Sequence, residues 1–150
     1  MSVMAGIFAG AAGTAALDIV TYLDMTVRGR PASVLPAQAA GKLADRAGAD
    51  LGSGEVAESR REGVGALLGY AVGLGVGGLY GLLAGDRNVP LPVAALGLSV
   101  AGMAAGDAPY TALRLTDPRE WDAVSWASDI VPHLVYGLTT AAVYRHLTRP

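Results

Sequence analysis

The stretch GALLGYAVGLGVGGLYGLLAG, residues 65–85, places glycine at every fourth position over five helical turns. In water each glycine inside a helix costs about 1 kcal/mol relative to alanine, so eight glycines in 21 residues should unfold such a helix. A bilayer removes the unfolded alternative, because every backbone polar group there must be hydrogen-bonded within the chain. Glycine then becomes useful, since small residues let two helices approach closely. The stretch therefore predicts a helix immersed in hydrocarbon.

The regularly spaced glycines form a ridge along this helix, which we expect to pack against other helices. Its members are Gly65, Gly69, Gly73, Gly77, Gly81 and Gly85. A matching face of small residues occurs earlier in the chain, at Gly6, Gly10 and Gly13. Two interpretations stay open: the ridge packs within one bundle, or it also joins two copies into a homodimer or larger homo-oligomer.

Four apolar segments reach or approach the roughly 20 helical residues that a bilayer requires. They cover residues 3–23, 63–84, 89–106 and 130–147. The second and third contain no charged residue, so they are the clearest spans. The pattern predicts an all-α integral membrane bundle of four transmembrane helices with short interfacial helices, forming a single domain over residues 1–150. The alternative is a soluble helical domain rich in alanine and glycine.

The composition excludes some classes of partner and site. The chain has no cysteine, so it forms no disulfide framework and no thiolate metal site. Its formal net charge is −2, which does not favour nucleic acid as a partner. The expected partner is the lipid bilayer itself.

Lysine and arginine are distributed unevenly between the two ends of the predicted bundle. Residues 24–62 contain six and residues 107–129 contain two, against three on the opposite side. Because basic residues concentrate in cytoplasmic loops, we expect these two segments inside and both termini outside a bacterial plasma membrane. A secretory signal peptide fits poorly, since the first residues lack lysine and arginine and Asp18 interrupts the apolar run.

The segment 24–62 is long for a loop and is expected to be partly helical. Ser33, Pro36 and Gly48 delimit a short surface helix over residues 33–48.

A second helix start is predicted at Asp117-Pro118-Arg119-Glu120, because aspartate at the N-cap, proline next and glutamate three residues on are typical of helix N-termini. This helix should cover residues 118–131 and carry Trp121 and Trp126 at the level of the lipid headgroups.

Polar side chains are expected to gather at one end of the bundle. The C-terminal ends of spans one and three lie on the same side as the N-terminal ends of spans two and four, whichever way the protein faces. The candidate ion- or ligand-binding residues at this end are Asp18, Tyr22, Asp24, Asp107, Asp129, His133 and Tyr136. Arg28 and Arg30 are candidates for contact with a lipid headgroup.

Three interpretations of this group stay open. The acidic residues could cap helix ends and pair with nearby arginines, or form a proton or cation site, as ionisable chains inside membranes often do. They could also hold a divalent metal or a phosphate in a lipid-modifying enzyme. No spacing matches a lipid phosphotransferase or phosphatase, so we assign no catalytic residue, and cofactor and metal stay unknown. A non-enzymatic accessory or scaffold subunit of a membrane complex is the alternative function.

Two stretches carry a resemblance to known proteins: AGAAGTAALDIVTYLDMTVRGRPASVLP (9–36) and TDPREWDAVSWASDIVPHLVYG (116–137). They resemble small, uncharacterised four-helix membrane proteins of actinobacteria. The opening Gly-x-x-Gly-Thr helix with its proline-bearing loop is also similar to YagU-type inner-membrane proteins. The resemblance implies a plasma-membrane protein of unassigned activity, and the YagU-type similarity implies a role in tolerating acid.

Overall fold

The computed structural model describes residues 2–85 and 87–149, and these residues form five α-helices and one short 3-10 helix. The order is α1 (Ser2–Arg28), α2 (Leu35–Ala47), α3 (Gly54–Ala84), α4 (Leu91–Ala112), η1 (Pro118–Glu120) and α5 (Ala123–Thr148). No strand occurs in this part of the chain. The predicted all-α class is confirmed.

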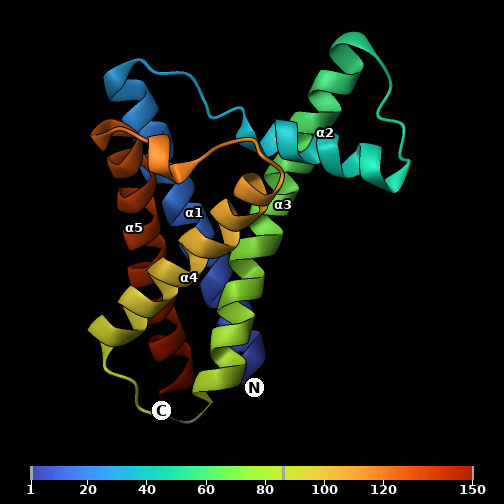
Figure 1. The fold of residues 1–150 in the computed structure, drawn as a ribbon. Coiled ribbons are helices and arrows are strands. Elements are labelled where there is room, and N and C mark those ends of the chain that lie inside the picture. The colour runs from blue at the N-terminus through green and yellow to red at the C-terminus, as the bar shows by residue number, and fades with distance from the viewer. Residues whose placement is uncertain (1, 86, 150) are drawn as a thin grey trace.

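The long helices pack in an antiparallel arrangement that brings both chain ends to one end of the bundle (Figure 1). Helix α1 packs against α3 and α5, and α4 packs against α5 and, less extensively, α3. The short helix α2 packs on the first turns of α3, and the two project together from the end opposite the termini.

Three of the helices, α1, α3 and α4, are long and apolar enough to cross a membrane. They agree with the first three predicted spans, although each helix extends beyond its predicted limits by several residues. These three helices indicate a membrane protein. Helix α5, which contains the fourth predicted span, is not among them.

The distribution of side chains also fits a lipid environment. Large apolar side chains point outward, for example Leu67 (70% exposed) and Phe8 (62% exposed). The buried positions hold mainly alanine, glycine and tyrosine, as in the cluster of Ala9, Ala84 and Tyr144. Such a pattern would be costly in water, where large exposed apolar patches are rare on monomers. In hydrocarbon it permits tight packing of helix backbones.

Glycines bring α1 and α3 into direct backbone contact. A β-carbon added to Gly77 would collide with the Gly6 carbonyl and lie 2.7 Å from the Gly10 Cα. One added to Gly81 would meet the Ser2 carbonyl in the same way, and one added to Gly73 would overlap the Thr14 hydroxyl. Only glycine leaves room for such an approach, so this part of the predicted ridge does pack against another helix.

The remaining members of the ridge have other surroundings. Gly65 faces α2, where an added β-carbon would lie 2.6 Å from the Pro36 carbonyl carbon. Gly69 has no atom within 4 Å of the corresponding position. Gly85 follows the end of α3, with φ +52°, and therefore lies outside the helical ridge. The ridge is continuous in sequence but changes partner along its length, because α2 replaces α1 near the start of α3.

The surface helix predicted over residues 33–48 is present as α2. It ends at Gly48, whose φ of +67° is a left-handed cap that favours glycine. The helix expected over 118–131 is divided. Asp117 accepts a hydrogen bond from the Arg119 amide at 3.0 Å, as a cap should, but only η1 follows.

The chain then extends at Trp121 and begins α5 with a second cap, in which Asp122 accepts a bond from the Ser125 amide at 2.7 Å. Two successive capping residues thus produce a short turn and a long helix in place of one continuous helix. Helix α5 continues through Pro132 without ending.

Candidate functional site

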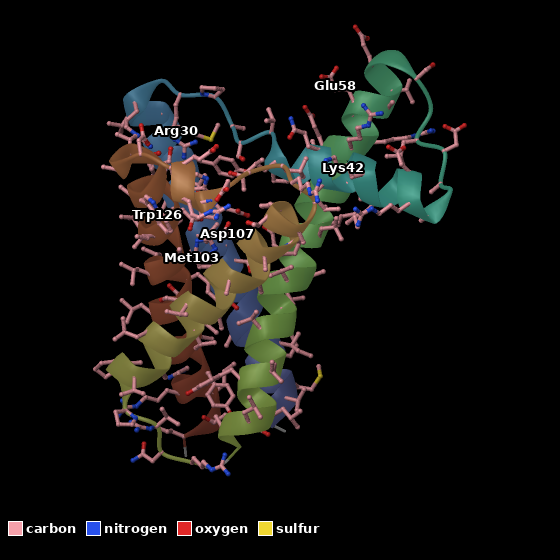
Figure 2. The ribbon with its side chains drawn as sticks, in the orientation of Figure 1. Arg30, Lys42, Glu58, Met103, Asp107 and Trp126 are labelled. Carbon is pink, nitrogen blue, oxygen red and sulfur yellow. The ribbon has the colours of Figure 1, made fainter. Side chains whose placement is uncertain are left out.

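The candidate polar residues lie at the end of the bundle away from the chain termini. Figure 2 shows Asp107, Trp126 and Arg30 at this end, on α4, α5 and the segment after α1. The structure divides the candidates into three groups, which contact different helices. The group between α4 and α5 has the most unusual surroundings.

His133 and Asp129 form the centre of this group, one helical turn apart on α5. The His133 Nδ1 lies 2.8 Å from the Asp129 backbone carbonyl and 3.2 Å from its Oδ1. Both neighbours are acceptors, so Nδ1 must carry a hydrogen to be satisfied. The Nε2 atom is therefore the position at which a neutral imidazole would accept a proton.

Asp107 adds a second carboxylate from α4 and interacts with both Asp129 and His133. The Oδ2 atom of Asp129 is buried and has no hydrogen-bond partner within residues 2–85 and 87–149. A buried carboxylate oxygen without a donor is costly, more so beside a second carboxylate. The arrangement is satisfied when a proton lies on one of the two acids. We call Asp107, Asp129 and His133 the α4–α5 cluster.

Small residues of α4 make room for this cluster. A β-carbon added to Gly106 would lie 4.0 Å from the His133 Nε2, and one added to Gly102 would lie 3.6 Å from the His133 Cδ2. The imidazole thus lies over the glycine face of α4, beside the turn that carries Asp107. The sequence pattern Gly-x-x-x-Gly-Asp at residues 102–107 thus supplies the Asp107 carboxylate and, beside it, the space that the His133 ring occupies.

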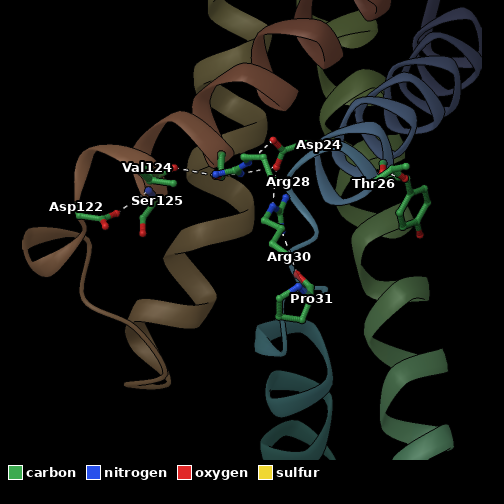
Figure 3. Close-up of polar contacts among 10 residues, drawn as sticks. Asp24, Thr26, Arg28, Arg30, Pro31, Asp122, Val124 and Ser125 are labelled. Carbon is green, nitrogen blue, oxygen red and sulfur yellow. Dashed lines mark hydrogen bonds and ion pairs between the residues drawn. The ribbon is translucent and has the colours of Figure 1, made fainter.

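The second group joins α1 to α5. Arg28 Nε and Arg30 Nε each donate to the Asp24 carboxylate at 2.6 Å, and Figure 3 shows these contacts converging on Asp24. Arg28 also donates to the Ser128 hydroxyl at 2.6 Å, the residue before Asp129. Both arginines predicted to contact a headgroup are therefore engaged by Asp24, and Arg28 ties the end of α1 to the residue beside the α4–α5 cluster.

The third group lies between α1 and α3. Asp18 lies close enough to Tyr70 to interact with its hydroxyl, and Tyr70 also interacts with Tyr22. Tyr22 itself is 60% exposed. Asp18 and Tyr22 are thus brought together, but with α3 and not with the α4–α5 cluster. Tyr70 lies near Asp18 because α1 and α3 are antiparallel and Gly10 lies opposite Gly73. Residues that follow Gly10 on α1 are therefore close to residues that precede Gly73 on α3.

Tyr136 lies deeper in the bundle than the cluster and is only 2% exposed. Its hydroxyl donates to the Gly73 carbonyl at 2.7 Å, and its ring packs on Gly102. This side chain fills the core between α3, α4 and α5. It closes the bundle on the side of the cluster that faces the chain termini, and its hydroxyl donates to the backbone of α3.

The connection between α4 and α5 has the features of a membrane–water boundary. The rings of Trp121 and Trp126 meet edge to face at 5.1 Å, and the Trp121 indole donates to the Thr116 hydroxyl at 2.7 Å. The Arg119 guanidinium lowers the pKa of Asp117 to about 2, through a side-chain hydrogen bond. Hydrogen bonds to Ser125 likewise hold the pKa of Asp122 below its usual value. Both acids are charged at neutral pH.

Two contributors were not predicted from the sequence. Ser128 was not singled out because it is one of many hydroxyl residues, and only the position of Arg28 gives it a role. Lys42 reaches from α2 to the Leu113 carbonyl at 2.7 Å and so caps the end of the helix that carries Asp107. The sequence predicts only that Lys42 lies in the middle of a surface helix, so it does not predict the contact with Leu113.

Metal binding has little support in the part of the chain that is described. Within residues 2–85 and 87–149, no group of three or more histidine, aspartate or glutamate side chains is arranged to hold a metal ion. Comparison with family models, with curated proteins and with solved structures gave no match. The function must therefore be argued from the geometry alone.

Proposed function

We propose that this chain is an integral membrane protein of four transmembrane helices whose α4–α5 cluster binds one proton from the inner side of a bacterial plasma membrane. The observation that carries the proposal is the buried Asp129 Oδ2, which has no donor among the described residues and lies beside Asp107 and His133. Inner and outer here follow the distribution of basic residues.

The proposal treats α5 as the fourth span. At 26 residues it is about 39 Å long, enough to cross the hydrocarbon core. Its mean apolar character is reduced by polar residues that face the bundle, as intramembrane ionisable residues usually do. Its outer face stays apolar, with exposed Val131, Leu134 and Leu138.

The balance of charge favours a proton over a larger ligand. Asp24, Asp107 and Asp129 supply three negative charges, and Arg28 and Arg30 supply two positive charges. With a neutral His133, the α4–α5 cluster and the neighbouring Asp24–Arg28–Arg30 group together carry one net negative charge, which a single proton removes. Two carboxylates close together in a low-dielectric site do not both stay charged, and a shared proton is the simplest resolution.

The surroundings favour binding from one side over conduction through the bundle. Tyr136 blocks the path beyond the cluster, and its hydroxyl donates to a backbone carbonyl that cannot pass a proton onward. A lipid phosphate at the cluster is disfavoured because the carboxylates would repel it and Asp24 already engages both nearby arginines. The similarity to YagU-type proteins would connect such a proton site with acid tolerance.

The two tryptophans of the chain make a built-in reporter for this proposal. Trp126 lies one turn before Asp129 on α5 and contacts Trp121. In lipid nanodiscs we expect tryptophan fluorescence to change with pH in a one-proton transition, accompanied by loss of a protonated-carboxyl infrared band. Asp107→Asn and Asp129→Asn should each abolish that transition.

Asp18→Asn is the matched control, because Asp18 is half-buried at the same end but interacts with Tyr70 of α3 and not with the α4–α5 cluster. It should retain the wild-type transition. If Asp107→Asn and Asp129→Asn both fold and both keep the transition, the cluster does not bind the proton, and the accessory or scaffold function becomes the better account.

A further inference from the structure

A second polar site lies at the opposite end of the bundle, where α5 ends near the chain termini. A surface depression of about 470 Å³ is lined there by Ala142, Arg145, His146 and Arg149. The lining contains two guanidinium groups and one imidazole, and it contains no acidic side chain. Basic residues in a last helical turn interact favourably with the helix dipole, but that interaction does not require a hollow between them.

The two arginines are arranged to act together. Arg145 lies in the last turn of α5, and Arg149 is the residue with extended backbone that follows the helix end; both line the depression. The Arg149 Nη2 donates to the Asn88 side-chain oxygen at 2.8 Å, which fixes its guanidinium from the connection between α3 and α4. Among residues 2–85 and 87–149, the Arg145 guanidinium has no side-chain partner. Its donors are therefore available to an anion.

The same face of α5 continues as an apolar strip toward the middle of the bundle. Leu138 is 53% exposed and Val131 is 49% exposed. Both precede Ala142 on α5, at spacings that place them on the same face of the helix. A cationic depression at the end of a helix, with an apolar strip leading into the bilayer, matches the polarity of a phospholipid, which has a charged headgroup and an apolar chain. The phosphate fits the arginine forks, and an acyl chain fits the strip.

We propose that Arg145 and Arg149 bind the phosphate of an anionic phospholipid in the outer leaflet, with one acyl chain along Leu138 and Val131. The proposal rests on α5 crossing the bilayer, which is part of the proposed function, but it does not depend on the proton cluster. Free inorganic phosphate shares the headgroup chemistry but lacks the chain, so the two ligands can be separated by experiment.

The test is native mass spectrometry of the protein released from bilayers of phosphatidylcholine and phosphatidylglycerol. Wild-type protein should retain phosphatidylglycerol selectively. The double variant Arg145→Gln/Arg149→Gln should retain it about tenfold less, as loss of a paired charge-assisted contact predicts. Arg87→Gln is the matched control, because Arg87 lies at the same end, donates to the Leu83 carbonyl at 2.6 Å and does not line the depression.

Selective loss in the double variant, with Arg87→Gln unaffected, supports the lipid site. Equal retention by wild-type and double variant overturns it, and so does full displacement of the lipid by inorganic phosphate at equal concentration, which would identify a free-anion site. The pH-dependent tryptophan signal should be unchanged in the double variant, so failure of this site is distinguishable from failure of the proton site.

Discussion

The α1–α3 and α4–α5 interfaces both contain glycine at four-residue spacing, but the space that glycine leaves is used differently. Between α1 and α3 it is filled by the opposing backbone, with Gly6 and Gly10 against Gly77. Between α4 and α5 it is filled by side chains, with the Tyr136 and His133 rings over Gly102 and Gly106. The first interface is closed by backbone contact at its glycines, with Asp18 and Tyr70 further along, whereas in the second an ionisable ring lies over the glycines. Glycine spacing therefore predicts close approach, and the opposing residues decide whether the result is packing or a site.

The largest expected effect is from Gly77→Ala. The new β-carbon would lie 2.9 Å from the Gly10 nitrogen and against the Gly6 carbonyl, so two helix backbones would have to separate. We expect the free energy of unfolding to fall by about 1–3 kcal/mol, as for overpacked cores, measured by reversible unfolding in detergent.

Gly69→Ala is the matched control for this variant, since nothing lies within 4 Å of its added β-carbon. It should leave the unfolding free energy within about 0.5 kcal/mol of wild type, the usual range for positions without tight contacts. An equal loss in both variants would contradict the backbone contact as the cause, because helix propensity by itself favours alanine at both positions.

A smaller effect is expected from Gly102→Ala at the second interface. Its β-carbon would lie 3.1 Å from two ring carbons of Tyr136, and a ring can shift where a backbone cannot. Stability should change by less than about 1.5 kcal/mol. The pH of the tryptophan transition should move, however, because the Tyr136 ring that must shift lies one turn from His133 on α5, and the same β-carbon contacts the His133 ring at 3.6 Å.

Gly106→Ala tests whether that shift is specific to the Tyr136 and His133 contacts. Its β-carbon would meet the His133 Nε2 only at 4.0 Å, an ordinary contact distance. The pH of the transition should stay at its wild-type value. If Gly102→Ala leaves the transition unmoved, the glycine face of α4 has no part in holding the imidazole.

The smallest effect concerns Asp117, outside both interfaces. Because the Arg119 guanidinium lowers its pKa to about 2, the ion pair contributes above the ordinary aspartate pKa and is lost as the pH falls through about 2. A carboxyl NMR titration should find this low value, and Arg119→Gln should raise the pKa toward 3.8. The free energy of unfolding at neutral pH should fall only slightly in that variant, because solvent screens an ion pair whose arginine is 88% exposed. A titration at the ordinary value in wild-type protein would rule out the pair.

Much of the helical plan follows from the sequence, but the limits of the helices and the grouping of the polar residues do not. The apolar runs predict α1, α3 and α4, and Gly48 predicts the end of α2. The helix expected at Asp117 is divided because Asp122 caps a second helix start five residues later. The sequence around each aspartate did not show which of the two would begin the long helix. The position of each acid along its helix predicted that the acids lie at one end of the bundle. The sequence could not predict that Asp18 and Asp129 belong to different groups, because that depends on which face of its helix each residue occupies.

What the sequence alone determined is the all-helical class, the three apolar helices and the small-residue faces, because periodicity and hydropathy are local properties of the chain. The tertiary structure decided the partners: Gly6 against Gly77, Asp24 with its two arginines, and Asp107 beside Asp129 and His133. These pairs depend on helix rotation and register, which are set by the packing of several helices at once. No single segment contains that information, so the orphaned oxygen of Asp129 could be found only once α4 and α5 were side by side.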